Sequence, residues 1–170
     1  PHDGGGDLLF LGLVGLFGLF QEQIRQIEEV FAQHPGGVEI VSVSDSKSEE
    51  ARARKEWDAV IQEHPDINVA INFAAESAEF CWEAVNDSGL RDDVLIYGVD
   101  DMPVNLELVR EGKVDGIVAT SFYQYGYHSV ELLYDYLVNG NIPPEQEKTD
   151  LQIVDRSNVE TYREDEHESR

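Results

Sequence analysis

Apolar segments of strand length alternate with amphipathic segments of helix length along nearly the whole chain. Turn-forming sequences such as "HPGG" at 34–37 and "NGNIPP" at 139–144 close the helical segments. This alternation is typical of a parallel β-sheet whose strands are joined by helices, so it predicts an α/β fold. The predicted strands are residues 8–14, 38–43, 68–73, 94–99, 116–120 and 151–154. The predicted helices are residues 21–33, 48–63, 77–86, 104–111 and 123–138.

The length of 170 residues, of which 41% are hydrophobic, suits one domain with a real core. We expect a flexible N-terminal linker at 1–7, an α/β ligand-binding lobe at 8–162 and a disordered acidic tail at 163–170. The apolar run at 8–20 is too short for a membrane span and predicts a buried strand that leads into a glycine-rich loop. No signal peptide is recognised in this chain.

The net charge of -23 excludes nucleic acid as an obvious partner, because a phosphate backbone requires a basic face. The single cysteine, Cys81, lies in an apolar helical pattern and is expected to be a small core residue. The five histidines have no metal-ligand spacing, and no nucleophile motif is present. We therefore expect no metal, no cofactor, no catalytic residues and no enzymatic activity.

Two carboxylates, Asp100 and Asp101, follow the predicted strand at 94–99. Ligand sites of open α/β sheets form at the carboxyl edge of the strands, which is where this pair is expected. Two other readings stay open: a turn in which aspartate binds backbone amides, and a Mg²⁺ or phosphoryl-acceptor site. Glu76 follows another strand, and it also suits the N-terminus of a helix, where the helix dipole favours negative charge.

Four segments resemble, in order and spacing, the C-terminal half of type 1 periplasmic binding proteins, the sugar-binding subunits of ABC importers related to ribose-binding protein. The segments are "HPDINVAINFAAESA", "VLIYGVDDMP", "LVREGKVDGIVATSFYQYGYHSVELL" and "LQIVDRSNVETY". The resemblance covers about residues 21–162 and implies a flavodoxin-like lobe, a parallel-sheet three-layer sandwich. It also implies binding of a small polar solute, a sugar or related polyol, for an ABC transport system with a membrane permease as partner. The implied location is periplasmic or extracellular.

The same resemblance implies the roles of several residues. Asp100 is similar to the ligand-binding aspartate of the family, and Asp101 would lie just behind it. Gln23 falls near the position of a sugar-binding arginine, and Thr120 falls at a polar position after a strand. Phe17 would flank the cleft, where family members stack aromatic rings on sugars, although core packing is the alternative. The family's usual Asn-Asp pair is replaced by alanines at 74 and 75, which thins the polar set.

The resemblance does not extend to the N-terminal lobe of the family, on which the helix at 123–138 would pack. We therefore expect that helix to be covered by a second copy in a homodimer or by the missing lobe. An effector-sensing domain of a lactose-repressor-type regulator has the same fold and remains an alternative. An α/β oligomerisation module without a ligand is the other alternative.

Overall fold

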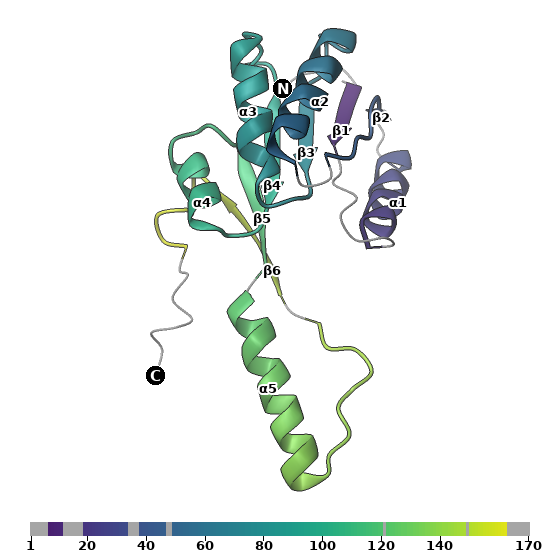
Figure 1. Cartoon of the computed structure of the whole chain (residues 1–170), viewed down its shortest axis with the longest axis vertical. Coiled ribbons are helices and arrows are strands. Elements are labelled where there is room, and N and C mark those ends of the chain that lie inside the picture. Colours follow the sequence, from purple (N-terminus) through teal and green to yellow (C-terminus); the bar gives the residue numbers. More distant parts are fainter. Residues whose placement is uncertain are drawn as a thin grey trace.

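The computed structural model describes residues 7–11, 19–33, 38–46, 49–120, 122–148 and 150–162. Phe17, most of the predicted N-terminal linker and the predicted tail at 163–170 lie outside the described residues. Strands and helices alternate as the sequence predicts (Figure 1). The strands are β1 (Asp7–Leu11), β2 (Glu39–Ile40), β3 (Val69–Asn72), β4 (Leu95–Val99), β5 (Gly116–Thr120) and β6 (Leu151–Asp155). The helices are α1 (Leu19–Ala32), α2 (Glu50–Glu63), α3 (Ser77–Asp87), α4 (Pro103–Arg110) and α5 (Phe122–Asn139).

The strands form one sheet in the order β2-β1-β3-β4-β5-β6, so the predicted α/β class is confirmed. The pairs from β2 to β5 are parallel, whereas β6 runs antiparallel to β5, with Thr120 opposite Leu151 and Gly116 opposite Asp155. The sequence predicts a parallel sheet, and β6 departs from that prediction. The physical reason is the connection: α5 and the segment after it leave the sheet at the carboxyl end of β5 and return there, which reverses the direction of β6.

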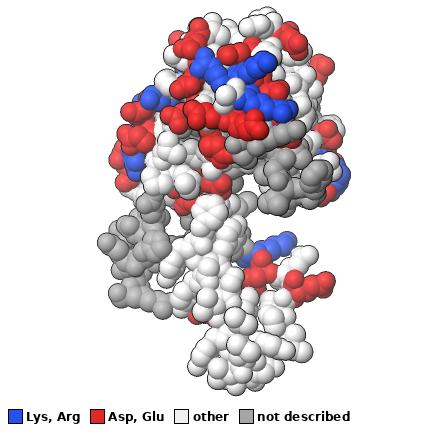
Figure 2. Space-filling view, viewed as in Figure 1, with Lys and Arg blue, Asp and Glu red and all other residues white. Residues whose placement is uncertain are grey.

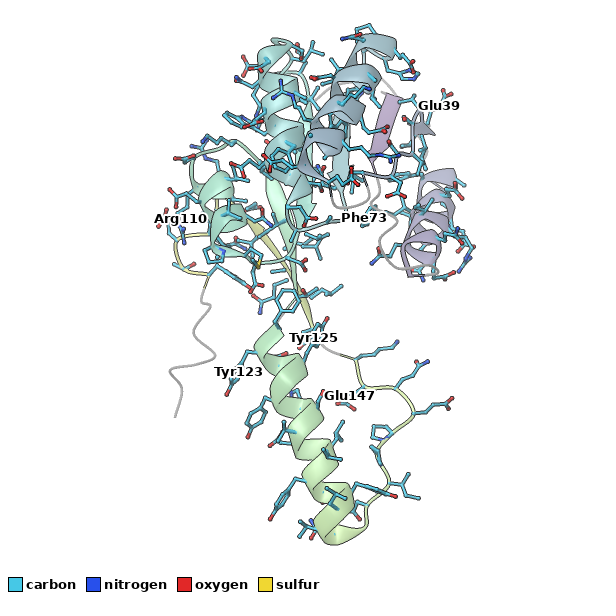
Figure 3. All side chains as sticks on the ribbon, in the orientation of Figure 1. Glu39, Phe73, Arg110, Tyr123, Tyr125 and Glu147 are labelled. Atoms are coloured by element: carbon cyan, nitrogen blue, oxygen red, sulfur yellow. The ribbon has the colours of Figure 1, made fainter. Side chains whose placement is uncertain are left out.

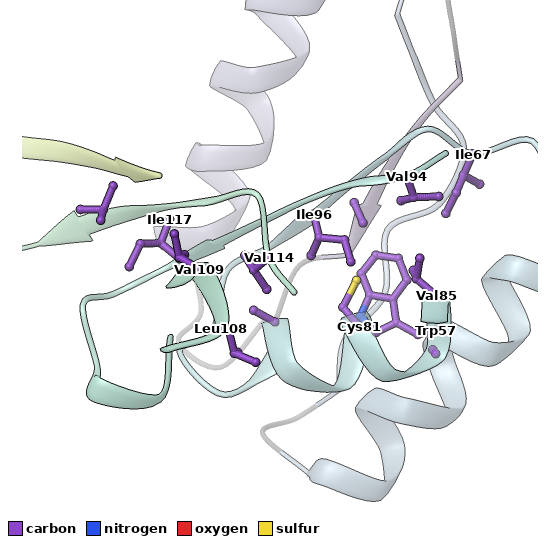
Figure 4. Close-up of a cluster of buried hydrophobic side chains, with 14 of the residues drawn as sticks. Trp57, Ile67, Cys81, Val85, Val94, Ile96, Leu108, Val109, Val114 and Ile117 are labelled. Atoms are coloured by element: carbon purple, nitrogen blue, oxygen red, sulfur yellow. The ribbon is translucent and has the colours of Figure 1, made fainter. Parts of the chain in front are cut away.

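The hydrophobic core lies between one face of the sheet and helices α2, α3 and α4 (Figure 4). Trp57 of α2 and Cys81 of α3 are fully buried, and they share this core with Ile96 of β4 and Ile117 of β5. Burial also raises the pKa of the Cys81 thiol, because the charged thiolate is poorly solvated there. The prediction that Cys81 is a core residue is confirmed.

Helix α4 has clear signals at both ends. Pro103 occupies its first turn, where the missing backbone N–H costs nothing, and Gly112 follows its C-terminus with a φ of 72°. The amides of Gly112 and Lys113 donate to the carbonyls of Val109 and Leu108, which ends the helix and directs the chain into β5.

Helix α5 extends away from the sheet instead of packing on it (Figure 1). None of its described residues is buried. The sheet face that does not carry the core keeps Leu95 and Ile153 exposed, at 48% and 66%. A three-layer sandwich has helices on both faces of its sheet. Helix α5 does not cover the face that carries Leu95 and Ile153.

Candidate functional site at the carboxyl edge of the sheet

Asp100 lies directly after β4, where the parallel strands end. Its φ of 68° is a left-handed conformation that few residues other than glycine, asparagine and aspartate adopt. The backbone N–H of Asp100 donates to the carbonyl of Val118 at 2.9 Å, and the hydroxyl of Thr120 donates to its Oδ1 at 2.9 Å. The structure thus brings together two residues, Asp100 and Thr120, that the sequence indicated separately.

The negative charge of Asp100 is incompletely compensated. Burial raises the pKa of this carboxyl above its ordinary value, the Thr120 hydrogen bond opposes the rise, and the carboxylates of Asp101 and Glu76 add to it. Within the described ranges, Oδ2 of Asp100 has no hydrogen-bond partner. A bound group that donates a hydrogen bond to this oxygen would therefore stabilise the charged form.

A buried asparagine, Asn105 of α4, holds the two loops of this edge together. Its amide nitrogen lies within hydrogen-bonding distance of the carbonyls of Ala75 at 2.8 Å, Val99 at 3.0 Å and Asp100 at 3.2 Å. Only 1% of its surface is exposed. Sequence reasoning missed Asn105, although a polar residue one position before the buried Leu106 was an available signal.

Asp101 has a different partner from Asp100. Its Oδ2 accepts a hydrogen bond of 2.7 Å from the hydroxyl of Tyr162, so Asp101 ties the segment after β6 to the loop after β4. Glu76 is exposed at the residue before α3, which fits a charge at a helix N-terminus. It reaches Asp100 only through its charge.

Gln23 lies in the first turns of α1 and is partly buried. Its Oε1 is buried and has no hydrogen-bond partner among the residues that the structure describes. A buried acceptor without a donor is unfavourable, so Gln23 would also gain from a ligand hydroxyl. Phe73, which sequence reasoning did not select, follows β3 at the same edge of the sheet and is half-buried (Figure 3).

A cavity of about 540 Å³ lies at the opposite edge of the sheet, between the start of β4 and the end of β6. Arg91 lines it and donates to the carbonyls of Val94 and Gly112 and to the carboxylate of Asp115. These bonds fasten the starts of β4 and β5 together. The cavity is therefore separate from the Asp100 edge, and Arg91 has a structural role there.

Two classes of feature are absent from the described parts of the chain. No group of three or more histidine, cysteine, aspartate or glutamate residues there could hold a metal ion, so Asp100 and Asp101 have no such companions. No helix there combines the length and the apolar character needed to cross a membrane.

Comparison with solved structures shows a close likeness in fold. The periplasmic ribose ABC transporter protein from Conexibacter woesei DSM 14684 is 21% identical, with a TM-score of 0.82. An ABC transporter periplasmic solute binding protein from Actinobacillus succinogenes 130z with bound D-allose is 22% identical, with a TM-score of 0.80. An ABC transporter solute binding protein from Bacillus halodurans C-125 with bound myo-inositol is 23% identical, with a TM-score of 0.79.

These matches cover 92%, 91% and 94% of this chain but only 53%, 54% and 54% of the solved chains, in the same order. The chain therefore spans about half the length of those structures. A comparison with curated proteins gave no match. The sequence model of the family described as "Periplasmic binding protein domain" matches residues 18–141, which is most of the chain. The resemblance found in the sequence is thereby confirmed, and the chain belongs to the periplasmic binding protein domain family.

Proposed function

We propose that this chain is a non-enzymatic lobe that binds a small neutral polyol, such as a sugar or cyclitol, at the carboxyl edge of its sheet. The observation that carries the proposal is Asp100. Its half-buried carboxylate is held by Thr120 through one oxygen, while the other has no partner within the described ranges.

The chemistry of this carboxylate favours a ligand with hydroxyl groups. A carboxylate oxygen has two lone pairs and accepts charge-assisted hydrogen bonds, which are stronger than those between neutral groups. The unpaired Oε1 of Gln23 is a second acceptor, although an uncharged one. Ala74 and Ala75 offer no side-chain hydrogen bonds, so recognition depends on few polar groups.

The surrounding charge favours a neutral ligand over an acidic one. Burial raises the pKa of Asp100, the nearby carboxylates of Asp101 and Glu76 add to that rise, and the whole chain carries a net charge of -23. A sugar phosphate or sugar acid would meet this negative potential at close range. The solved structures with bound D-allose and myo-inositol, both uncharged polyols, support this choice of ligand class.

The family also supports a role in transport. We propose that the chain acts as the substrate-binding component of an ABC transport system. It would work outside the cytoplasmic membrane, with a membrane permease as its partner. The three solved structures compared above are named as ABC transporter proteins, and their likeness to this chain supports the proposal.

The test is a binding titration of the chain with D-ribose, D-allose, myo-inositol and glucuronate. Binding is measured by calorimetry or NMR. We expect one or more of the neutral polyols to bind and glucuronate to bind more weakly than D-allose. Asp100→Asn should reduce the affinity roughly 10- to 150-fold, since a hydrogen bond to a charged group contributes about 1.5–3 kcal/mol.

Asp93→Asn is the matched control, because Asp93 is exposed just before β4 at the other edge of the sheet. It removes the same charge from the chain without touching the proposed site. Equal affinity in the wild type and Asp100→Asn, or equal losses in both variants, would contradict the proposed role of Asp100.

A further inference from the structure

The carboxylate of Asp100 is held from one side. The hydroxyl of Thr120 donates to its Oδ1 at 2.9 Å, and this is the one hydrogen bond that the side chain of Asp100 makes among the residues that the structure describes. The other oxygen, Oδ2, is left without a donor there. The two oxygens of this carboxylate are therefore not equivalent, and Thr120 determines which of them stays open.

Thr120 can hold the carboxylate in a defined position because its own backbone is fixed on both sides. It is the last residue of β5, whose Val118 lies opposite Val99 of β4, and Thr120 itself lies opposite Leu151 of β6. The backbone of Asp100 is attached to the same strand, since its N–H donates to the carbonyl of Val118 at 2.9 Å. A β-branched side chain also has few accessible χ1 rotamers, which restricts where the hydroxyl can lie.

The open oxygen is also where the carboxylate would take up a proton. A proton on Oδ2 leaves the hydrogen bond from Thr120 in place, whereas a proton on Oδ1 would require the Thr120 hydroxyl to turn away. Oδ2 is the same oxygen that would accept a hydrogen bond from the proposed ligand. A proton and a ligand hydroxyl therefore compete for one atom.

The surroundings of Asp100 favour the proton. Among the described residues, the charged groups that act on it are two carboxylates, Asp101 on its own loop and Glu76 on the loop before α3. Acidic side chains are also spread over the body of the molecule, which carries a net charge of -23 (Figure 2). Burial and then these two carboxylates raise the pKa of Asp100, and the hydrogen bond from Thr120 opposes the rise.

We propose that Thr120 is a positioning residue, which keeps Asp100 charged, reserves its Oδ2 for a ligand hydroxyl, and so sets the acid limit below which the site releases its ligand. Thr120 then acts on the ligand through Asp100. The inference rests on the proposed function for the nature of the ligand. The effect of Thr120 on the charge of Asp100 needs no ligand and can be tested separately.

The first test is a pH titration of the ligand-free full chain, in which NMR follows the carboxyl carbon of Asp100. Thr120→Val removes the hydroxyl from a side chain of nearly the same shape, so we expect the pKa of Asp100 to be higher than in the wild type. Thr120→Ser keeps the hydroxyl and should restore the wild-type pKa. Ser88→Ala is the control, because it removes a hydroxyl that binds the carbonyl of Val85 at the other end of α3.

Two outcomes of the first test would overturn the proposal. One is an Asp100 pKa that is unchanged in Thr120→Val. The other is a rise that also occurs in Thr120→Ser, since it would then come from a disturbed loop and not from the lost hydroxyl. Circular dichroism checks that each variant is folded, and Thr120→Ala removes the same hydroxyl if valine is not tolerated.

The second test measures the affinity of the chain for D-allose and myo-inositol by calorimetry, from neutral pH down to the pH at which circular dichroism detects unfolding. If a proton and the ligand compete for Oδ2, the affinity of the wild type should fall by up to about tenfold for each pH unit below the pKa of Asp100. The fall should begin at a higher pH in Thr120→Val, and Thr120→Ser should follow the wild type.

Two results of the second test would contradict the proposal. An affinity that is reduced in Thr120→Val by the same factor at every pH would show that Thr120 contacts the ligand itself. A wild-type affinity that stays constant while Asp100 takes up its proton would show that the proton and the ligand do not compete. If none of the polyols binds although the first test gives the expected shift, the proposed function fails and the role of Thr120 at Asp100 stands.

Discussion

Asn105→Asp tests how the carboxyl edge of the sheet is held in place. The two side chains have nearly the same size and shape, but an ionised aspartate cannot donate a hydrogen bond. The Asn105 amide has two protons to share among the carbonyls of Ala75, Val99 and Asp100. The substitution therefore removes the donor and leaves a carboxylate facing three carbonyl oxygens.

The expected loss of stability follows from this count. Two carbonyls lose their hydrogen-bond donor. They do so in the protein interior, because only 1% of the surface of Asn105 is exposed. An unsatisfied buried polar group costs about 1–3 kcal/mol, so the two carbonyls together should cost roughly 2–6 kcal/mol. For a chain of this size, that corresponds to a decrease in Tm of about 4–24 °C.

The assay is thermal and urea unfolding followed by circular dichroism, at a protein concentration low enough to avoid association. Asn86→Asp is the control, because it makes the same chemical change at an exposed position of α3. We expect this control to cost less than about 1 kcal/mol, mainly through the helix dipole. Equal stability of the wild type and Asn105→Asp would refute the reasoning that Asn105 holds the two loops together.

Three further predictions concern other parts of the structure. Gly112→Ala and Gly89→Ala should each destabilise the chain by about 1–2 kcal/mol, because both glycines have positive φ and the Arg156 guanidinium near Gly112 ends an exposed side chain that can move aside; urea unfolding that shows no loss in either variant would contradict this. Gly126→Ala should raise the stability of the chain by about 0.5–1 kcal/mol, because alanine favours a helix and the new Cβ would meet no atom within 4 Å; urea unfolding that shows no gain would contradict this. Asp100→Asn should be more stable than the wild type at neutral pH, because burial and then the carboxylates of Asp101 and Glu76 raise the pKa of Asp100 in the folded state. The folded state then holds the proton more tightly than the unfolded state, so the gain should shrink as the pH falls through the raised pKa and vanish below about 3.9; a Tm difference that does not change with pH would contradict this.

The alternation of apolar and amphipathic segments was sufficient to predict the elements of the fold. Helix α3, predicted at 77–86, spans Ser77–Asp87, and β5 was predicted with its observed bounds. The predicted strand at 38–43 shortens to Glu39–Ile40, because local apolarity does not determine how many residues find a pairing partner. The direction of β6 was also beyond the pattern, since periodicity is the same for both strand directions.

The candidate site was predictable only in part. A strand that ends in Gly-Val-Asp indicated Asp100, and the resemblance indicated Thr120, but their hydrogen bond depends on the pairing of β4 with β5. The bond between Tyr162 and Asp101 joins residues far apart in the sequence, so no local pattern could reveal it. The roles of Gln23 and Phe17 in ligand binding remain predictions.

The most direct test of the account is an NMR titration of the Asp100 carboxyl carbon, assigned by its absence from the spectrum of Asp100→Asn. Without ligand, we expect the pKa of Asp100 to lie above the ordinary value for aspartate. A saturating neutral polyol should lower that pKa, because hydroxyl donors stabilise the carboxylate. An Asp100 resonance and pKa that respond to none of the polyols would contradict the claim that this carboxylate recognises the ligand.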